Sequence, residues 1–86
     1  MNRQEIFNKI DEERTYQENK WGVEFDDQNT INDWVTYINQ YASHAARMNV
    51  GVDHVEENLI KVAALAVAAL EAIDRNGGLP NRHYDE

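Results

Sequence analysis

The sequence predicts an all-α protein: a three-helix bundle made of two long antiparallel helices and an N-terminal helix. Pro80 is the only proline, and three of the four glycines lie from Gly51 onward, so long intervals contain no residue that breaks a helix. Within those intervals, apolar residues recur at a period near 3.6. We therefore expect one helical domain over residues 1–86, with an irregular tail over residues 77–86.

The first helix is expected over residues 2–19. Ile6, Phe7 and Ile10 follow helical spacing there, and the remaining faces are mostly charged, as on a solvated surface.

The second helix is expected to begin at Thr30. Thr30 and Asp33 have the spacing of a capping box, in which each side chain satisfies an unpaired amide of the first turn. We expect this helix to end within residues 49–51. Trp34 and Tyr41 fall on its apolar stripe and are assigned to the core.

The third helix is expected to open with a capping box of Asp53 and Glu56 and to end at Gly77, which suits a left-handed C-cap. Residues 62–70, VAALAVAAL, leave it without a polar face, so it must be surrounded. A chain of 86 residues offers few partner helices of its own. We therefore predict a homo-oligomer, a dimer or larger, joined through this Ala-rich helix. The alternative is a monomeric bundle with unusually tight packing.

Composition excludes several classes of protein. Sixteen acidic and eight basic residues give a net charge of -8, which disfavours non-specific contact with nucleic acid or anionic membrane. The chain contains no cysteine, so disulfides and thiolate metal sites are excluded. No apolar segment resembles a signal peptide or is long enough to span a bilayer. We expect a soluble cytoplasmic protein, with no membrane partner and no direct nucleic-acid binding.

Acidic residues are the candidate metal ligands, because carboxylates on facing helices hold Mg²⁺ or Mn²⁺ in all-α proteins. Glu71 and Asp74 share one face of the third helix, and Glu57 lies earlier on it. In so acidic a chain this spacing also arises by chance, so we favour a solvated face and no metal. The three histidines lie on separate elements and do not predict zinc.

Two clusters place a cation beside an aromatic ring, a combination that suits a phosphate and a base. Lys20 and Trp21 end the first helical region, and the tail carries Arg82, His83 and Tyr84. The alternative for Trp21 is a hydrophobic plug that closes the end of the bundle.

A motif in the first helix suggests a family. The residues from Glu13 through Gln17 to Gly22 read E-R-x-x-Q-x-x-K-W-G, and KVAALAVAALEAIDR forms most of the third helix. These segments resemble small MazG-like proteins of phages and prophages, within the all-α nucleoside triphosphate pyrophosphohydrolase superfamily. The resemblance covers residues 1–22, Trp34 and the third helix. It implies oligomers built around long helices, and Mg²⁺-dependent cleavage of a nucleotide between its α and β phosphates.

The family's metal-binding motifs, E-E-x-x-E and E-x-x-D, are degenerate in this chain. The corresponding positions are Asn39, Gln40, Ser43, Asn58 and Lys61, and none of them is acidic. The resemblance therefore implies a nucleotide pocket without its metal, in which Lys61 replaces the positive charge of Mg²⁺. Gln17, Lys20 and Trp21 carry the matching motif and are expected to bind the ligand.

We expect a non-catalytic or weakly catalytic nucleotide-binding protein without a cofactor. By analogy, a phage protein of this kind would sequester nucleotides in the host cytoplasm. One alternative is a Mg²⁺-dependent pyrophosphohydrolase with a rearranged site at Glu57, Glu71 and Asp74. The other is an acidic module that binds and inhibits a host nucleic-acid-binding enzyme.

Overall fold

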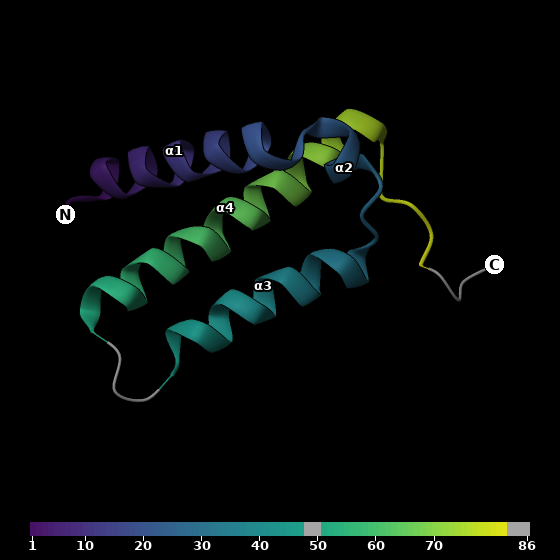
Figure 1. Cartoon of the computed structure of the whole chain (residues 1–86). Coiled ribbons are helices and arrows are strands. Elements are labelled where there is room, and N and C mark those ends of the chain that lie inside the picture. The colour runs from purple at the N-terminus through teal and green to yellow at the C-terminus, as the bar shows by residue number, and fades with distance from the viewer. Residues whose placement is uncertain (48–50, 83–86) are drawn as a thin grey trace.

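A computed structural model describes residues 1–47 and 51–82. These residues form four α-helices and no strand: α1 (Arg3–Trp21), α2 (Val23–Asp27), α3 (Ile31–Ala45) and α4 (Val52–Asn76) (Figure 1). The predicted all-α class is confirmed, but the count of three helices is wrong. Helix α2 has only five residues, too few for a 3.6-residue period to appear in the sequence. None of the helices in the described ranges has the length and apolar character needed to cross a membrane.

Helix α1 begins after an Asn2 cap and ends two residues beyond its predicted end. The Asn2 side chain accepts a hydrogen bond from the Glu5 backbone N–H at 2.9 Å, and the Glu5 carboxylate accepts one from the Asn2 N–H at 3.4 Å. Gly22 then turns the chain with φ of 85°, a conformation that favours glycine. Because Gly22 caps both the end of α1 and the start of α2, it sets the direction in which α2 leaves α1.

The predicted start of α3 is confirmed. The Thr30 hydroxyl accepts from the Asp33 backbone N–H at 3.2 Å, and the Asp33 carboxylate accepts from the Thr30 N–H at 2.9 Å. The helix ends at Ala45, earlier than the predicted end, and residues 48–50 lie outside the described residues.

The predicted start of α4 is wrong, whereas its predicted end is confirmed. Gly51 occupies the N-cap position with extended backbone angles, and Asp53 lies inside the first turn, where a carboxylate is stabilised by the helix dipole. At the other end, Gly77 adopts φ of 71°, and the Gly78 N–H donates to the Ile73 carbonyl at 3.1 Å. Residues 77–82 that follow are not helical.

Helix α4 is the central element of the fold. Helices α1, α2 and α3 each pack against it, and in the described part of the chain α1 and α3 do not approach each other. Figure 1 shows α3 running antiparallel to α4, with α1 on the other side of α4. Helices α1 and α3 therefore flank α4 without covering its whole surface.

The apolar core is small. Its buried members, Trp34, Leu65, Ala68 and Ala72, join α3 to α4. Trp34 is 2% exposed, which confirms its assignment to the core, while Tyr41 is only half-buried. By contrast, twelve large apolar side chains in the described residues are exposed. A domain of this size is marginal when its core is limited to so few residues.

Candidate functional site

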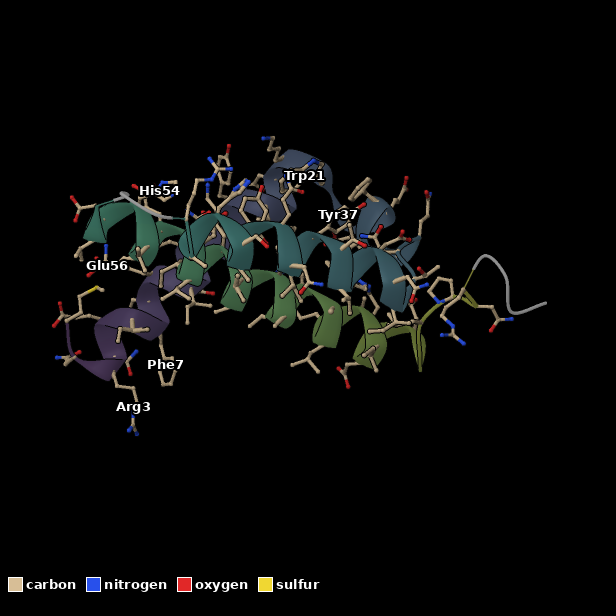
Figure 2. The ribbon with its side chains drawn as sticks, turned by 90° about the horizontal axis from the view of Figure 1, so that it is seen from below. Arg3, Phe7, Trp21, Tyr37, His54 and Glu56 are labelled. Atoms are coloured by element: carbon tan, nitrogen blue, oxygen red, sulfur yellow. The ribbon has the colours of Figure 1, made fainter. Side chains whose placement is uncertain are left out.

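A cavity of about 200 Å³ lies over α4, with α1 and α2 on one side and α3 on the other. Figure 2 shows Trp21 and Tyr37, two of its lining residues, on the same side of the molecule. Five lining residues are aromatic, so we call this cavity the aromatic pocket. It is lined by Gln17, Trp21, Phe25, Asp26, Asn29, Trp34, Tyr37, Gln40, Tyr41, Leu65 and Ala68.

The aromatic rings form two walls of different geometry. Trp21 and Phe25 stack with centroids 6.4 Å apart and planes inclined by 25°. Trp34 and Tyr37 meet edge to face at the same centroid distance, with an interplanar angle of 88°. Trp21 is 41% exposed and so is not a buried plug at the end of the helices. Rings left this accessible offer a flat ligand a surface on which to stack.

Three polar atoms of pocket residues are buried without a hydrogen-bond partner in the described structure. They are Gln17 Oε1, Asn29 Nδ2 and Trp34 Nε1. An unpaired buried polar atom costs about 1–3 kcal/mol, and native proteins retain few of them. Gln17 Oε1 needs a donor, and Asn29 Nδ2 and Trp34 Nε1 each need an acceptor.

Arg14 ties the wall of the pocket to the rest of the fold. Its Nε donates to Glu71 Oε1 at 2.7 Å, and its Nη2 donates to Asp26 Oδ2 at 3.2 Å. Both Arg14 and Asp26 are buried, so this ion pair joins α1 to α2 out of contact with bulk water. Burial raises the pKa of Asp26, and the positive charge of Arg14 offsets only part of that rise.

A second group of contacts holds α2 from its other end. The Asp27 carboxylate accepts from Arg75 Nε at 3.0 Å and from Asn76 Nδ2 at 2.9 Å, and also forms an ion pair with Arg75 Nη2. These bonds, those from Arg75 first, lower the pKa of Asp27. Two adjacent aspartates thus fix α2 to α1 and to the end of α4, and this fixes Phe25 and Asn29 in the pocket wall.

Two lysines lie against aromatic residues of the pocket. Lys20 Nζ is 4.8 Å from the Trp21 ring centroid and 5.9 Å from that of Tyr16, and Lys61 Nζ is 5.5 Å from that of Tyr41. Neither lysine forms an ion pair with a carboxylate of the described residues. Tyr16 and Lys61 also line a second, more polar cavity of about 450 Å³, which shares no lining residue with the aromatic pocket.

The structure brings together four of the residues predicted to bind a ligand. Gln17 and Trp21 line the aromatic pocket, and Lys20 and Lys61 lie against its rings. The others are not placed there. Arg82 lies in the segment after α4 and does not line the pocket, and His83 and Tyr84 lie outside the described residues.

The conditional metal ligands are not brought together. Glu57 and Glu71 are fourteen positions apart on α4, which separates them by roughly 21 Å along the helix axis. Glu71 is paired with Arg14, and Asp74 is exposed near the end of α4. In residues 1–47 and 51–82, no group of three or more His, Cys, Asp or Glu side chains could hold a metal ion.

The positions that correspond to the family's metal ligands have separate surroundings. Gln40 lines the aromatic pocket, while Asn39 and Ser43 are exposed on α3. Asn58 is buried, and its Nδ2 donates to the His54 carbonyl at 2.8 Å within α4. Only Lys61 lies close to an aromatic ring of the pocket.

Sequence reasoning missed several pocket residues, chiefly Phe25, Asp26, Asn29 and Tyr37. The first three lie in a segment whose acids and amides suggest a solvated loop, and Tyr37 lies beside the apolar stripe of α3. The sequence carries no clear signal for them, because Arg14 has acids at helical spacing, Asp11 and Glu18, that could have been its partners. Its partner Asp26 comes twelve residues later, beyond any local helical pattern.

Comparison of this chain with protein-family models, curated proteins and solved structures finds no match. The resemblance to MazG-like proteins therefore stays a prediction from the residues, and the site has to be interpreted from its own geometry.

Proposed function

We propose that this protein binds a nucleotide without hydrolysing it, with the base in the aromatic pocket and the phosphates near Lys20 and Lys61. The observation that carries the proposal is that Gln17, Asn29 and Trp34, which line a pocket walled by aromatic rings, each hold a buried polar atom without a hydrogen-bond partner in the described structure. A nucleobase is flat enough to stack on these rings and carries donors and acceptors at its edge.

The two lysines support a phosphorylated ligand over a free base. Each ammonium group rests against an aromatic face and has no carboxylate partner among the described residues. An unpaired lysine beside a base pocket attracts the phosphate that follows the base and sugar. The overall charge of -8 would otherwise repel such an anion, so these local cations matter for binding.

The residues favour binding over catalysis. Where the resembled family places acidic metal ligands, this chain has neutral side chains at Asn39, Gln40 and Ser43 and a lysine at position 61. A cation in that place repels Mg²⁺ while attracting the phosphates directly. Sequestration of a nucleotide is a role that needs binding alone, and it follows the analogy with phage proteins.

We further propose that a second copy of the chain covers the opposite side of the molecule. Phe7, Leu59, Ala63, Val67 and Leu70 form what we call the outer face, where Phe7 is 55% exposed and Leu70 64% exposed. Figure 2 shows Phe7 on the side away from Trp21 and Tyr37. A two-fold dimer would bury this self-complementary surface and compensate for the small core, while the pocket stays open.

Thermal unfolding with a nucleotide panel at millimolar concentration tests the binding proposal. We expect particular nucleotides to raise the Tm, and Trp21→Ala to abolish that rise because the stacking surface is lost. Gln17→Leu should weaken binding about tenfold or more, since a hydrogen bond to the base is removed. It should not lower the Tm of the unliganded protein, because it also removes a buried unpaired atom.

Gln28→Leu is the matched control, because Gln28 is exposed and does not line the pocket. It should leave the nucleotide-dependent rise intact. If no nucleotide shifts the Tm, nucleotide binding is wrong and the acidic interaction module becomes the better explanation. Release of pyrophosphate in the presence of Mg²⁺ or Mn²⁺ would instead establish the pyrophosphohydrolase.

A further inference from the structure

One charged side chain lines the aromatic pocket, and its surroundings restrict what the ligand can present to it. Among the described lining residues, Asp26 alone carries a charge. It is 6% exposed, and its Oδ2 accepts from Arg14 Nη2. No donor of the described residues bonds to its other oxygen, Oδ1. Oδ1 is not among the enclosed unpaired atoms of the described residues, so it is open to a hydrogen bond from water or from a ligand.

We propose that Asp26 selects nucleotides whose base carries an exocyclic amino group, such as cytosine or adenine, over the corresponding bases that carry a carbonyl. The inference rests on the nucleotide binding proposed above and names the class of base. An amino group donates a hydrogen bond to a carboxylate, and this is how acidic side chains recognise the cytosine amino group in nucleic acids. A carbonyl oxygen in the same place would face a negative charge.

The poor solvation of Asp26 strengthens this preference. Burial raises its pKa, and the positive charge of Arg14 offsets only part of that rise. Electrostatic interactions in such a site are less weakened than in water, so a donated hydrogen bond gains more and a repulsive contact costs more. A binding site that forms a hydrogen bond with a ligand donor discriminates strongly against an analogue that lacks this donor.

Arg14 makes the selection specific to one orientation. Its guanidinium holds Oδ2 through a hydrogen bond of 3.2 Å, which restricts rotation of the carboxylate. The second tether, between Asp27 and Arg75, keeps α2 from moving Asp26 out of the pocket wall. The acceptor is therefore held in place before the ligand arrives, which lowers the entropy cost of recognition.

Titration calorimetry with two matched pairs of nucleotides tests the inference: CTP against UTP, and ATP against ITP. CTP and ATP carry an exocyclic amino group. In UTP and ITP a carbonyl replaces that group, and the adjacent ring nitrogen carries a proton. We expect the amino member to bind about tenfold or more tightly in the pair whose size fits the pocket. In Asp26→Asn the amide oxygen can keep the bond to Arg14 and turn its NH₂ to the ligand, so the ratio should collapse or invert.

Glu24→Gln is the matched control, since it removes one charge from the exposed side of the same helix and should leave the ratio unchanged. Equal binding within each pair by the unaltered protein, or tighter binding of the carbonyl member, overturns the inference and leaves nucleotide binding standing. If none of the four nucleotides binds, nucleotide binding itself fails, and the inference fails with it. The ratio measured on the unaltered protein decides the matter even if Asp26→Asn does not fold.

Discussion

The two sides of α4 present different chemistry to the solvent although both are built from apolar sequence. On the pocket side, Leu65 and Ala68 form the floor beneath aromatic rings, unpaired amides and a buried carboxylate. On the outer face, Leu59 and Leu70 are exposed aliphatic side chains. A ligand that completes unpaired polar atoms suits the pocket side, whereas an aliphatic surface fits a protein partner. The difference between the two faces separates ligand binding from self-association.

The largest expected effect is a loss of stability on the pocket side. Arg14→Met should lower the free energy of unfolding by about 3 kcal/mol, because Asp26 would remain buried without its counter-ion. Urea unfolding measures the loss. Nucleotide binding should also weaken, because only the contacts of Asp27 would then hold α2 in place.

Arg75→Met is the comparison, since the Arg75 ion pair is far more exposed than that of Arg14 and should contribute less. An equal loss of stability in the two variants would show that burial of Arg14 does not decide its importance.

An intermediate effect is expected on the outer face alone. Leu70→Glu should weaken dimer formation roughly thirtyfold, because a carboxylate would have to be buried in an apolar contact. Sedimentation across a range of protein concentrations measures the change, and nucleotide affinity should remain that of the unaltered protein.

Asn19→Asp serves as its control, since it adds the same charge at an exposed position of α1. If the unaltered protein is already a monomer at high concentration, the proposed dimer is wrong and the outer face needs another explanation.

The smallest expected effect is on the pH dependence of stability, to which Asp26 and Asp27 contribute in opposite directions. Asp26 has a pKa raised by burial, so the folded state holds its proton more tightly and stability falls as pH rises from the ordinary aspartate pKa to the raised one. Asp27 has a pKa lowered chiefly by its bonds from Arg75, so its contribution is present above the ordinary pKa and is lost as pH falls through the lowered one.

Unfolding measured over acidic pH should show both slopes. Asp26→Asn should remove the slope above the ordinary aspartate pKa, and Asp27→Asn the slope below it. The assignment fails if both variants alter the same pH window.

Local patterns predicted the parts of this fold that depend on neighbouring residues. The capping box of Thr30 with Asp33 and the left-handed Gly77 were predictable because each depends on residues within one helical turn. Asp53 and Glu56 have the same spacing but do not form a cap, because Gly51 already begins the helix. A spacing rule identifies compatible residues and does not choose between adjacent starting points.

Part of the candidate site was also predictable from the sequence. Lys20 and Trp21 were identified as a cation beside an aromatic ring and, with Gln17, as part of the motif of the resembled family. Lys61 was identified because it replaces an acid of that family. Their meeting around one pocket was not predictable, since Lys61 lies on α4, about forty positions later.

By itself, the sequence determined that the chain is helical, where α3 begins and where α4 ends, because these follow from short-range hydrogen bonds and apolar spacing. Only the tertiary structure decided that α1 and α3 flank α4 without close backbone contact between their described residues, which leaves room for the aromatic pocket between them. It also decided that Arg14 pairs with Asp26 across the turn at Gly22. Such contacts depend on how whole helices pack, and the energy of packing is shared among residues far apart in the chain.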